Sequence, residues 1–257
     1  ETDVSNASRP ITKKEMEDCK AAGIEYLEMP VAYDALTVVI NPKNDWARKM
    51  TVAELKAIWE PAAQGKITNW RQVNPAWPDR PLKLYGPGAD SGTFEYFTEA
   101  INGKSKATRG DFTASEDDNV LVQGVARDIG GLGYFGFAYF VENKSKLAAV
   151  SIATEAGKPA VGPSLDTVIN GTYQPLARPI FVYVNAKAAD RPDVREFVEY
   201  YMKHGESLAK EVKYVPLPAK AYAYNLEHFA KRAKGTKFGG ENKVGITIEE
   251  LMKIEAK

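Results

Sequence analysis

The chain has 257 residues, 44% of them hydrophobic and 26% charged, which is typical of a folded globular protein with one large domain or two smaller ones. Its 34 Lys and Arg residues balance its 34 Asp and Glu residues, so it lacks the basic excess typical of nucleic-acid-binding proteins. The single cysteine, Cys19, cannot form an internal disulfide, and no Cys and His cluster has the spacing of a zinc site, so neither a metal nor a cofactor is expected.

Helical and strand patterns alternate along the chain, which predicts an α/β protein. Hydrophobic period, capping residues and turn residues predict helices at 12–22, 51–59, 94–101, 119–128, 192–210, 219–232 and from about 247, and strands at 35–40, 82–85 and 180–184. Thr12 with Glu15, and Thr51 with Glu54, have the spacing of a capping box. The segment 233–245 is rich in Gly, Lys and Asn, and predicts an exposed loop.

The two strongest strands, 35–40 and 180–184, bracket the central block of the chain, and each is followed by an asparagine. This symmetry predicts a chain that leaves one lobe and later returns to it. We therefore expect two lobes joined by a double crossover, with a ligand in the cleft between them. Residues 1–40 and 176–257 would form lobe I, and residues 41–175 would form lobe II.

The sharpest motif is the segment GADSGT at 88–93, between a predicted strand and a predicted helix. Ser91 and Thr93 offer hydroxyl donors, and the backbone N–H groups of 92–94 would be unpaired in the first helical turn. Such a helix start is a physical site for an anion. The alternative is an ordinary helix cap at Ser91 or Asp90, which explains most sequences of this kind.

Two weaker candidates lie in other loops. Ser8 and Arg9 follow a short strand-like start and could offer hydroxyl and guanidinium donors to an oxyanion, although an ordinary polar turn is the explanation that the segment alone favours. Arg109 could reach the same anion or pair with the acidic run at 115–119. That run itself is typical of helix capping and of acidic residues complementing a helix dipole.

A hydrolase that uses Ser91 as nucleophile is the alternative from another class. The segment GADSG lacks the G-x-S-x-G spacing of a nucleophile elbow, because its first glycine lies one residue too far back. A serine nucleophile also needs a base, and the two histidines, His204 and His228, lie on predicted amphipathic helices. No Walker A or H-E-x-x-H motif occurs. We therefore expect a binding protein and no enzyme.

A resemblance covers essentially the whole chain. The stretches TDVSNASRPI, VAYDALTVVINP, IWEPAAQGKITNW, LYGPGADSGTFEYF, LGYFGFAYF, GTYQPLARPIFVYVN and YVPLP, in this order, resemble the substrate-binding subunit of the high-affinity phosphate ABC transporter. The resemblance implies a two-lobed type II periplasmic-binding-protein fold that closes on phosphate. It also implies a periplasmic or extracellular monomer, possible lipid anchoring, a permease as partner, and a role in phosphate starvation. A receptor for sulfate or another tetrahedral oxyanion is the alternative within this class.

The resemblance assigns phosphate-binding roles to Ser91, Gly92 and Thr93, which match the family's Ser-Gly-Thr loop, and to Ser8 in the other lobe. Members with Asp at the position of Ser8 use it to accept a proton from phosphate, so here Asp90 or another carboxylate would take that role. Where well-known members have Arg, four residues before the Ser of that loop, this chain has Pro87, so Arg9 or Arg109 would have to supply a guanidinium. The family's first strand and its Gly-Ser-Ser-Thr-like loop have no counterpart, so lobe I is expected to be incomplete.

Overall fold

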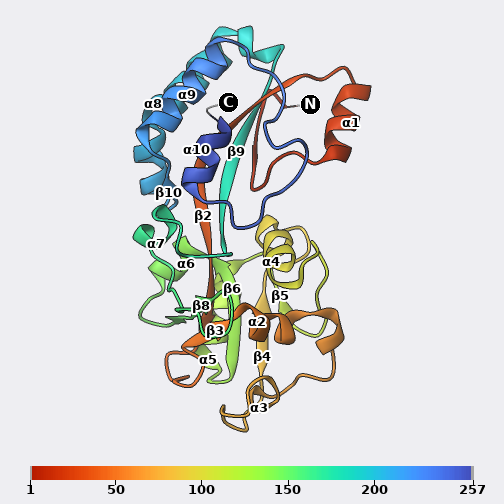
Figure 1. Ribbon diagram of the computed structural model, residues 1–257, viewed down its shortest axis with the longest axis vertical. Helices are drawn as coiled ribbons and strands as arrows, with labels where there is room; N and C mark the ends of the chain where they lie inside the picture. The colour runs from red at the N-terminus through yellow and green to blue at the C-terminus, as the bar shows by residue number, and fades with distance from the viewer. Residues whose placement is uncertain (1, 256–257) are drawn as a thin grey trace. The chain divides into compact units, whose positions relative to one another are not determined.

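The computed structural model describes residues 2–255, which form two compact units (Figure 1). The described part of unit 1 consists of residues 2–34 and 178–255, and unit 2 consists of residues 35–177. The chain therefore passes from unit 1 to unit 2 after Asp34 and returns to unit 1 at Arg178. Strand β2 (Tyr26–Ile40) carries the outward passage, and strand β9 (Ala177–Asn185) begins at the return.

Unit 1 surrounds the first part of β2 and almost all of β9. Its other elements are β1 (Val4–Ala7), α1 (Lys13–Ala21), η2 (Ala188–Asp190), α8 (Pro192–Glu211), β10 (Val215–Pro216), α9 (Ala219–Ala230) and α10 (Ile248–Glu255). Strand β1 pairs antiparallel with β9, and β10 pairs antiparallel with β2. In Figure 1, α8 and α9 run together along one side of these strands, and α1 lies on the other side.

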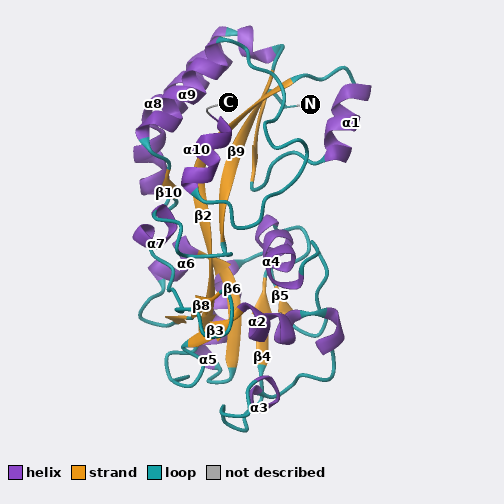
Figure 2. Cartoon of the chain, viewed as in Figure 1, coloured by secondary structure: helices purple, strands orange, loops and turns teal. Residues whose placement is uncertain are grey.

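Unit 2 contains the second part of β2 and a short mixed sheet. Its other elements are β3 (Lys49–Thr51), α2 (Val52–Trp59), η1 (Pro61–Ala63), α3 (Trp70–Val73), β4 (Lys83–Gly86), α4 (Gly92–Asn102), β5 (Thr113–Ala114), α5 (Asp118–Arg127), β6 (Gly131–Gly136), α6 (Phe137–Glu142), β7 (Ala148–Ala149), β8 (Ser151–Ala153) and α7 (Leu165–Ile169). Strand β6 pairs antiparallel with β2, and β4 lies parallel to both β6 and β5 (Figure 2). Strands β3 and β8 form a separate parallel pair.

The expected helices are present, and capping boxes explain where α1 and α2 begin. Thr12 and Glu15 form the predicted capping box at α1, and Thr51 and Glu54 form the one at α2. Such a box satisfies backbone N–H groups that the first helical turn leaves unpaired. Gly23, with φ of 66°, follows the end of α1, as expected of a residue free to adopt left-handed backbone.

Strand β2 is longer than the predicted strand at 35–40. Its first part, residues 26–34, contains Glu28, Pro30 and Asp34, which interrupt the apolar pattern from which strands are predicted. All of its residues except Tyr26 are buried, so the polar side chains must be satisfied inside unit 1. The short strands β3, β5, β7, β8 and β10, with two or three residues each, had no distinct sequence signal.

The predicted buried face of α8 is partly wrong. The apolar period of 192–210 predicts that Val194, Phe197, Val198, Tyr201 and Leu208 share one buried face. The buried residues of α8 are instead Val194, Val198, Met202, Gly205 and Ala209. Phe197 is 52% exposed. A Cβ on Gly205 would lie 2.2 Å from the ring of Tyr222 in α9, so small residues set the contact line between the two helices. A helix face predicted from large apolar residues alone does not include the small residues Gly205 and Ala209, which are buried here.

The segment 233–245 is also less exposed than predicted. Phe238 is buried, and its ring packs edge-on against Phe181 of β9 at a centroid distance of 5.4 Å. Gly235 forms an isolated parallel bridge with Leu27 of β2. These contacts hold the segment against the strands of unit 1. Within residues 2–255, no helix has both the length and the apolar character needed to cross a membrane.

Candidate anion site at the start of helix α4

The predicted anion motif forms a tight turn that leads from β4 into α4. The backbone N–H of Ser91 donates to the carbonyl of Gly88 at 3.1 Å, and Ser91 is the N-cap of α4 in extended backbone. Its Oγ accepts the backbone N–H of Thr93 at 3.2 Å. The expectation that the Thr93 N–H is unpaired is therefore wrong, because the capping hydroxyl takes it.

Capping does not exhaust the hydroxyl of Ser91. A serine hydroxyl has one proton and two lone pairs, and the capping bond uses a lone pair only. The proton of Ser91 can therefore still be donated to an oxyanion in front of the helix. The capping hydroxyl does not take the N–H of Phe94, the third residue of the helix. The capping reading and the anion-binding reading of Ser91 are thus compatible.

A buried aromatic cluster fixes the position of α4 within unit 2. Phe97 stacks on Tyr134 of β6 with ring centroids 3.6 Å apart, and it meets Trp59 of α2 edge-on at 5.7 Å. Phe94, in the first turn, is buried and stacks near Phe112. Because these rings lie under the helix, the first-turn donors are carried by a rigid element.

Two carboxylates lie beside this turn. Asp90 is exposed and is not the cap of α4, so the alternative that Asp90 caps the helix is wrong. Glu116 is the carboxylate that the sequence did not indicate. A Cβ on Gly88 would lie 1.9 Å from its Oε1, so the Glu116 carboxylate lies directly against the turn.

Strand pairing brings Glu116 to this place. Strand β5 pairs with β4 through Tyr85↔Thr113 and Gly86↔Ala114, and the N–H of Ser115 donates to the carbonyl of Gly86 at 3.2 Å. The run at 115–119 also caps a helix as predicted, because Asp117 is the N-cap of α5. The position of Glu116 beside Gly88 follows from the pairing of β5 with β4, and both strands are very short.

Arg109 is engaged inside unit 2. It is 3% exposed, and its Nε and Nη2 donate to the two carboxylate oxygens of Asp111 at 2.5 and 2.8 Å. Its Nη1 donates to the carbonyls of Ile58 and Ile67. Arg109 therefore pairs with Asp111, and the expectation that it pairs with the run at 115–119 is wrong. The fork also holds the pKa of Asp111 well below its ordinary value, at about 2.

Ser8 and Arg9 belong to unit 1, where they follow β1 in a bend. Ser8 is half-buried. The guanidinium of Arg9 donates to both carboxylate oxygens of Glu15, at 2.8 and 3.0 Å, and to the carbonyl of Pro10. Its hydrogen bond holds the pKa of Glu15 at about 2, so this pair is ionised at neutral pH. Arg9 thereby supports the capping box of α1.

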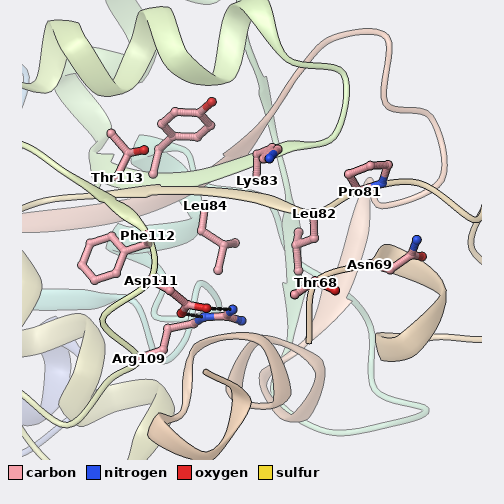
Figure 3. A pocket seen from close by; sticks show the side chains of 11 residues that line it. Thr68, Asn69, Pro81, Leu82, Lys83, Leu84, Arg109, Asp111, Phe112 and Thr113 are labelled. Carbon is pink, nitrogen blue, oxygen red and sulfur yellow. Dashed lines mark hydrogen bonds and ion pairs between the residues drawn. The ribbon is translucent and has the colours of Figure 1, made fainter. Parts of the chain in front are cut away.

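A pocket of about 720 Å³ lies in unit 2, but it does not include the turn at 88–93. Figure 3 shows Leu84 of β4 pointing toward the paired Arg109 and Asp111, and the lining also includes Thr68, Asn69, Leu82 and Thr113. The guanidinium in its wall already meets a carboxylate. The charge of Arg109 is therefore already matched by Asp111, and Lys83 is the other basic residue that lines the pocket.

The histidines that a serine hydrolase could use belong to a different unit from Ser91. Both histidines of the chain, on α8 and α9, belong to unit 1, so unit 2, which carries Ser91, contains none. His204 packs on Tyr200, with ring centroids 4.3 Å apart. Across residues 2–255, no group of three or more His, Cys, Asp or Glu side chains is arranged to hold a metal ion.

The sequence of this chain is similar to known proteins of one superfamily. The PBP superfamily domain matches residues 1–204. Protein SphX of Synechococcus elongatus is 54% identical over 255 residues, covering 99% of this chain and 75% of that protein. The phosphate-binding protein PstS of Staphylococcus saprophyticus is 36% identical over 224 residues, covering 86% of this chain and 67% of that protein.

Solved structures confirm the expected α/β periplasmic-binding-protein fold. A possible phosphate binding protein from Planctomyces limnophilus has a TM-score of 0.73 at 48% identity, covering 89% of this chain and 80% of that one. An ABC-type phosphate transport receptor from Vibrio cholerae shares the fold, with a TM-score of 0.64 at 21% identity over 84% of this chain and 80% of that one. The chain belongs to the PBP superfamily, in the family of substrate-binding proteins that includes the phosphate-binding protein PstS.

Proposed function

We propose that this protein binds inorganic phosphate and delivers it to the membrane permease of an ABC importer for high-affinity uptake. The observation that carries the proposal is the start of α4, where Ser91 caps a rigidly packed helix and retains a hydroxyl proton for an oxyanion. The names of the relatives PstS and of the Planctomyces limnophilus protein support phosphate as the ligand.

Phosphate would be held by neutral donors near a helix N-terminus. We assign the contacts in unit 2 to Ser91, Gly92 and Thr93, and the contact in unit 1 to Ser8. Hydroxyl and backbone N–H groups replace the water around the ion, and the helix dipole favours its negative charge. We leave Arg9 and Arg109 out of this set, because both already pair with carboxylates of their own units.

The remaining parts of the proposal follow the family. We infer that the protein acts outside the cytoplasm, as a monomer that a lipid anchor could hold at the membrane, and that it catalyses no reaction. The absence of a histidine from unit 2 supports the last point, since Ser91 has no imidazole base in its own unit.

Equilibrium binding of labelled phosphate, with sulfate as competitor, tests the proposal. Ser91→Ala removes a hydroxyl that donates to a charged ligand, so the expected loss of binding free energy is about 1–3 kcal/mol. Ser164→Ala is the matched control, because Ser164 caps α7 in the same unit and has no assigned role in binding. Both variants lose a helix cap, but only Ser91→Ala should weaken phosphate binding.

Three results would overturn the proposal. One is a parent protein that does not bind phosphate, and another is a protein that sulfate saturates equally well. The third is release of product from a chromogenic phosphate ester that Ser91→Ala abolishes, since it would make the protein a hydrolase.

A further inference from the structure

The hydroxyl of Tyr96 forms a hydrogen bond between α4 and residues 175–177, the segment through which the chain leaves unit 2. Tyr96 is 3% exposed, and its Oη lies 2.9 Å from the carbonyl oxygen of Pro175 and 2.9 Å from that of Ala177. One phenolic proton faces two carbonyl oxygens, which is the geometry of a three-centre hydrogen bond. Ala177 is the last residue before the return to unit 1.

Tyr96 lies where it can control the first turn of α4. It comes five residues after the cap Ser91, and helical side chains lean toward the N-terminus, so its side chain is directed toward the turn that holds the donors. The aromatic contacts of Phe97 hold an adjacent face of the helix. Those contacts fix one face of α4 by packing. The hydrogen bond of Tyr96 adds a directional restraint to a second segment of unit 2.

The segment to which Tyr96 binds is itself held in place. The N–H of Leu36 donates to the carbonyl of Leu176 at 2.8 Å, and the hydroxyl of Tyr173 donates to the carbonyl of Leu36 at 2.6 Å. These bonds connect the return segment to β2 within unit 2. The next residue of the chain, Arg178, pairs with Asp34 in unit 1. Tyr96 thus connects α4 to a fixed point at the chain crossing.

We propose that Tyr96 is a positioning residue for the oxyanion site. Its hydroxyl fixes the first-turn donors of α4 relative to the return segment, so that they are oriented before the anion arrives. The inference rests on the proposed phosphate-binding function, but it assigns no contact between Tyr96 and the ion. Preorganised donors bind an ion more tightly because less ordering is required on binding.

Tyr96→Phe tests the inference, with Tyr222→Phe as matched control. Tyr222 is buried in unit 1, where its hydroxyl donates to the carbonyl of Val31 at 2.9 Å and accepts the N–H of Leu217 at 3.2 Å, so Tyr222→Phe also removes a buried phenol-to-carbonyl bond, but in the other unit. Two quantities are measured: the Kd for inorganic phosphate, and amide hydrogen exchange without ligand at 91–95 and 174–178. Loss of one hydrogen bond predicts a Kd about fivefold higher for Tyr96→Phe, together with faster exchange in both segments.

The two measurements separate this inference from the proposed function. Tyr222→Phe should leave the Kd and the exchange of both segments unchanged. If Tyr96→Phe behaves like Tyr222→Phe in either measurement, the positioning role is wrong. If the parent protein does not bind phosphate, the proposed function fails, and exchange alone decides whether Tyr96 fixes α4: unchanged exchange overturns the role and faster exchange supports it.

Discussion

Asp34 and Arg178 form a buried ion pair, with 3.1 Å between Oδ2 of Asp34 and Nη2 of Arg178. The two residues are 6% and 4% exposed. Asp34 is the last residue of unit 1 before the chain leaves it, and Arg178 is the first after the chain returns. The pair therefore joins β2 and β9 at the point where both strands cross the boundary of unit 1.

Breaking one side of this pair should destabilise the protein strongly. Asp34→Asn leaves the Arg178 charge without its carboxylate in a buried position, which costs on the order of 3–5 kcal/mol for such pairs. Urea unfolding of the parent, Asp34→Asn, Arg178→Met and the double variant measures the loss and the coupling energy. We expect the double variant to lose less than the sum of the two single losses. Additive losses would show that the pair contributes no interaction energy.

The features predicted correctly from sequence depend on residues close together in the chain. The capping boxes of Thr12 with Glu15 and Thr51 with Glu54 span three residues, and the helix start at Ser91 is set by its own turn. The chemistry of such features is contained in one short segment, so a single sequence is enough.

The features that were missed depend on contacts between distant segments. Glu116 lies beside Gly88 because β5 pairs with β4 over two residue pairs. No sequence pattern in β4 or β5 predicts that pairing. Arg109 pairs with Asp111, only two residues away, but its hydrogen bonds to the carbonyls of Ile58 and Ile67 join distant segments and could not be predicted. The first part of β2 was missed because Glu28, Pro30 and Asp34 interrupt its apolar pattern, and Arg178, which pairs with Asp34, lies far along the chain.

A buried carboxyl at the end of α10 should make stability depend on pH. Glu255 is 3% exposed, and burial raises its pKa to about 7, with the charge of Lys237 opposing the rise and that of Glu28 adding to it. His228 also faces it, with Nδ1 3.9 Å from Oε2. The folded protein therefore holds a proton on Glu255 at pH values where the unfolded chain, with a pKa near 4.5, has lost it.

The sign follows from the extra proton of the folded state. Between about pH 4.5 and 7 the folded state binds more protons at this site, so the contribution of Glu255 to the free energy of unfolding falls as pH rises. Glu255→Gln should remove that decline, and the difference between parent and variant isolates it from His228, whose pKa is lowered by burial and contributes with the opposite sign. Urea unfolding of the parent and of Glu255→Gln from pH 4.5 to 8 measures the free energy of unfolding of each protein. Glu249→Gln, at an exposed position of α10, is the control. Parallel curves for the parent and Glu255→Gln would contradict the prediction.

Discrimination between phosphate and sulfate should depend on a carboxylate beside the turn at 88–93. Phosphate carries at least one proton near neutral pH, whereas sulfate carries none, so a carboxylate accepts a hydrogen bond from phosphate and meets only lone pairs on sulfate. The resemblance assigns Ser8 to the family's acidic position, so we predict Asp90 as the acceptor in this chain. Asp90→Asn keeps the shape and adds a donor. It should therefore weaken phosphate binding and strengthen sulfate binding.

The structure makes this substitution a clean test. Since Ser91 caps α4, Asp90→Asn should leave the free energy of unfolding nearly unchanged, and altered binding cannot be attributed to a lost cap. Glu116→Gln is the companion variant, because its carboxylate lies against Gly88 of the same turn. Competition of sulfate with labelled phosphate is measured for the parent and both variants. If selectivity shifts only in Glu116→Gln, Glu116 is the acceptor and the assignment to Asp90 is wrong. If it shifts in neither, both carboxylates lie outside the recognition of the phosphate proton, and the acceptor must be sought in unit 1.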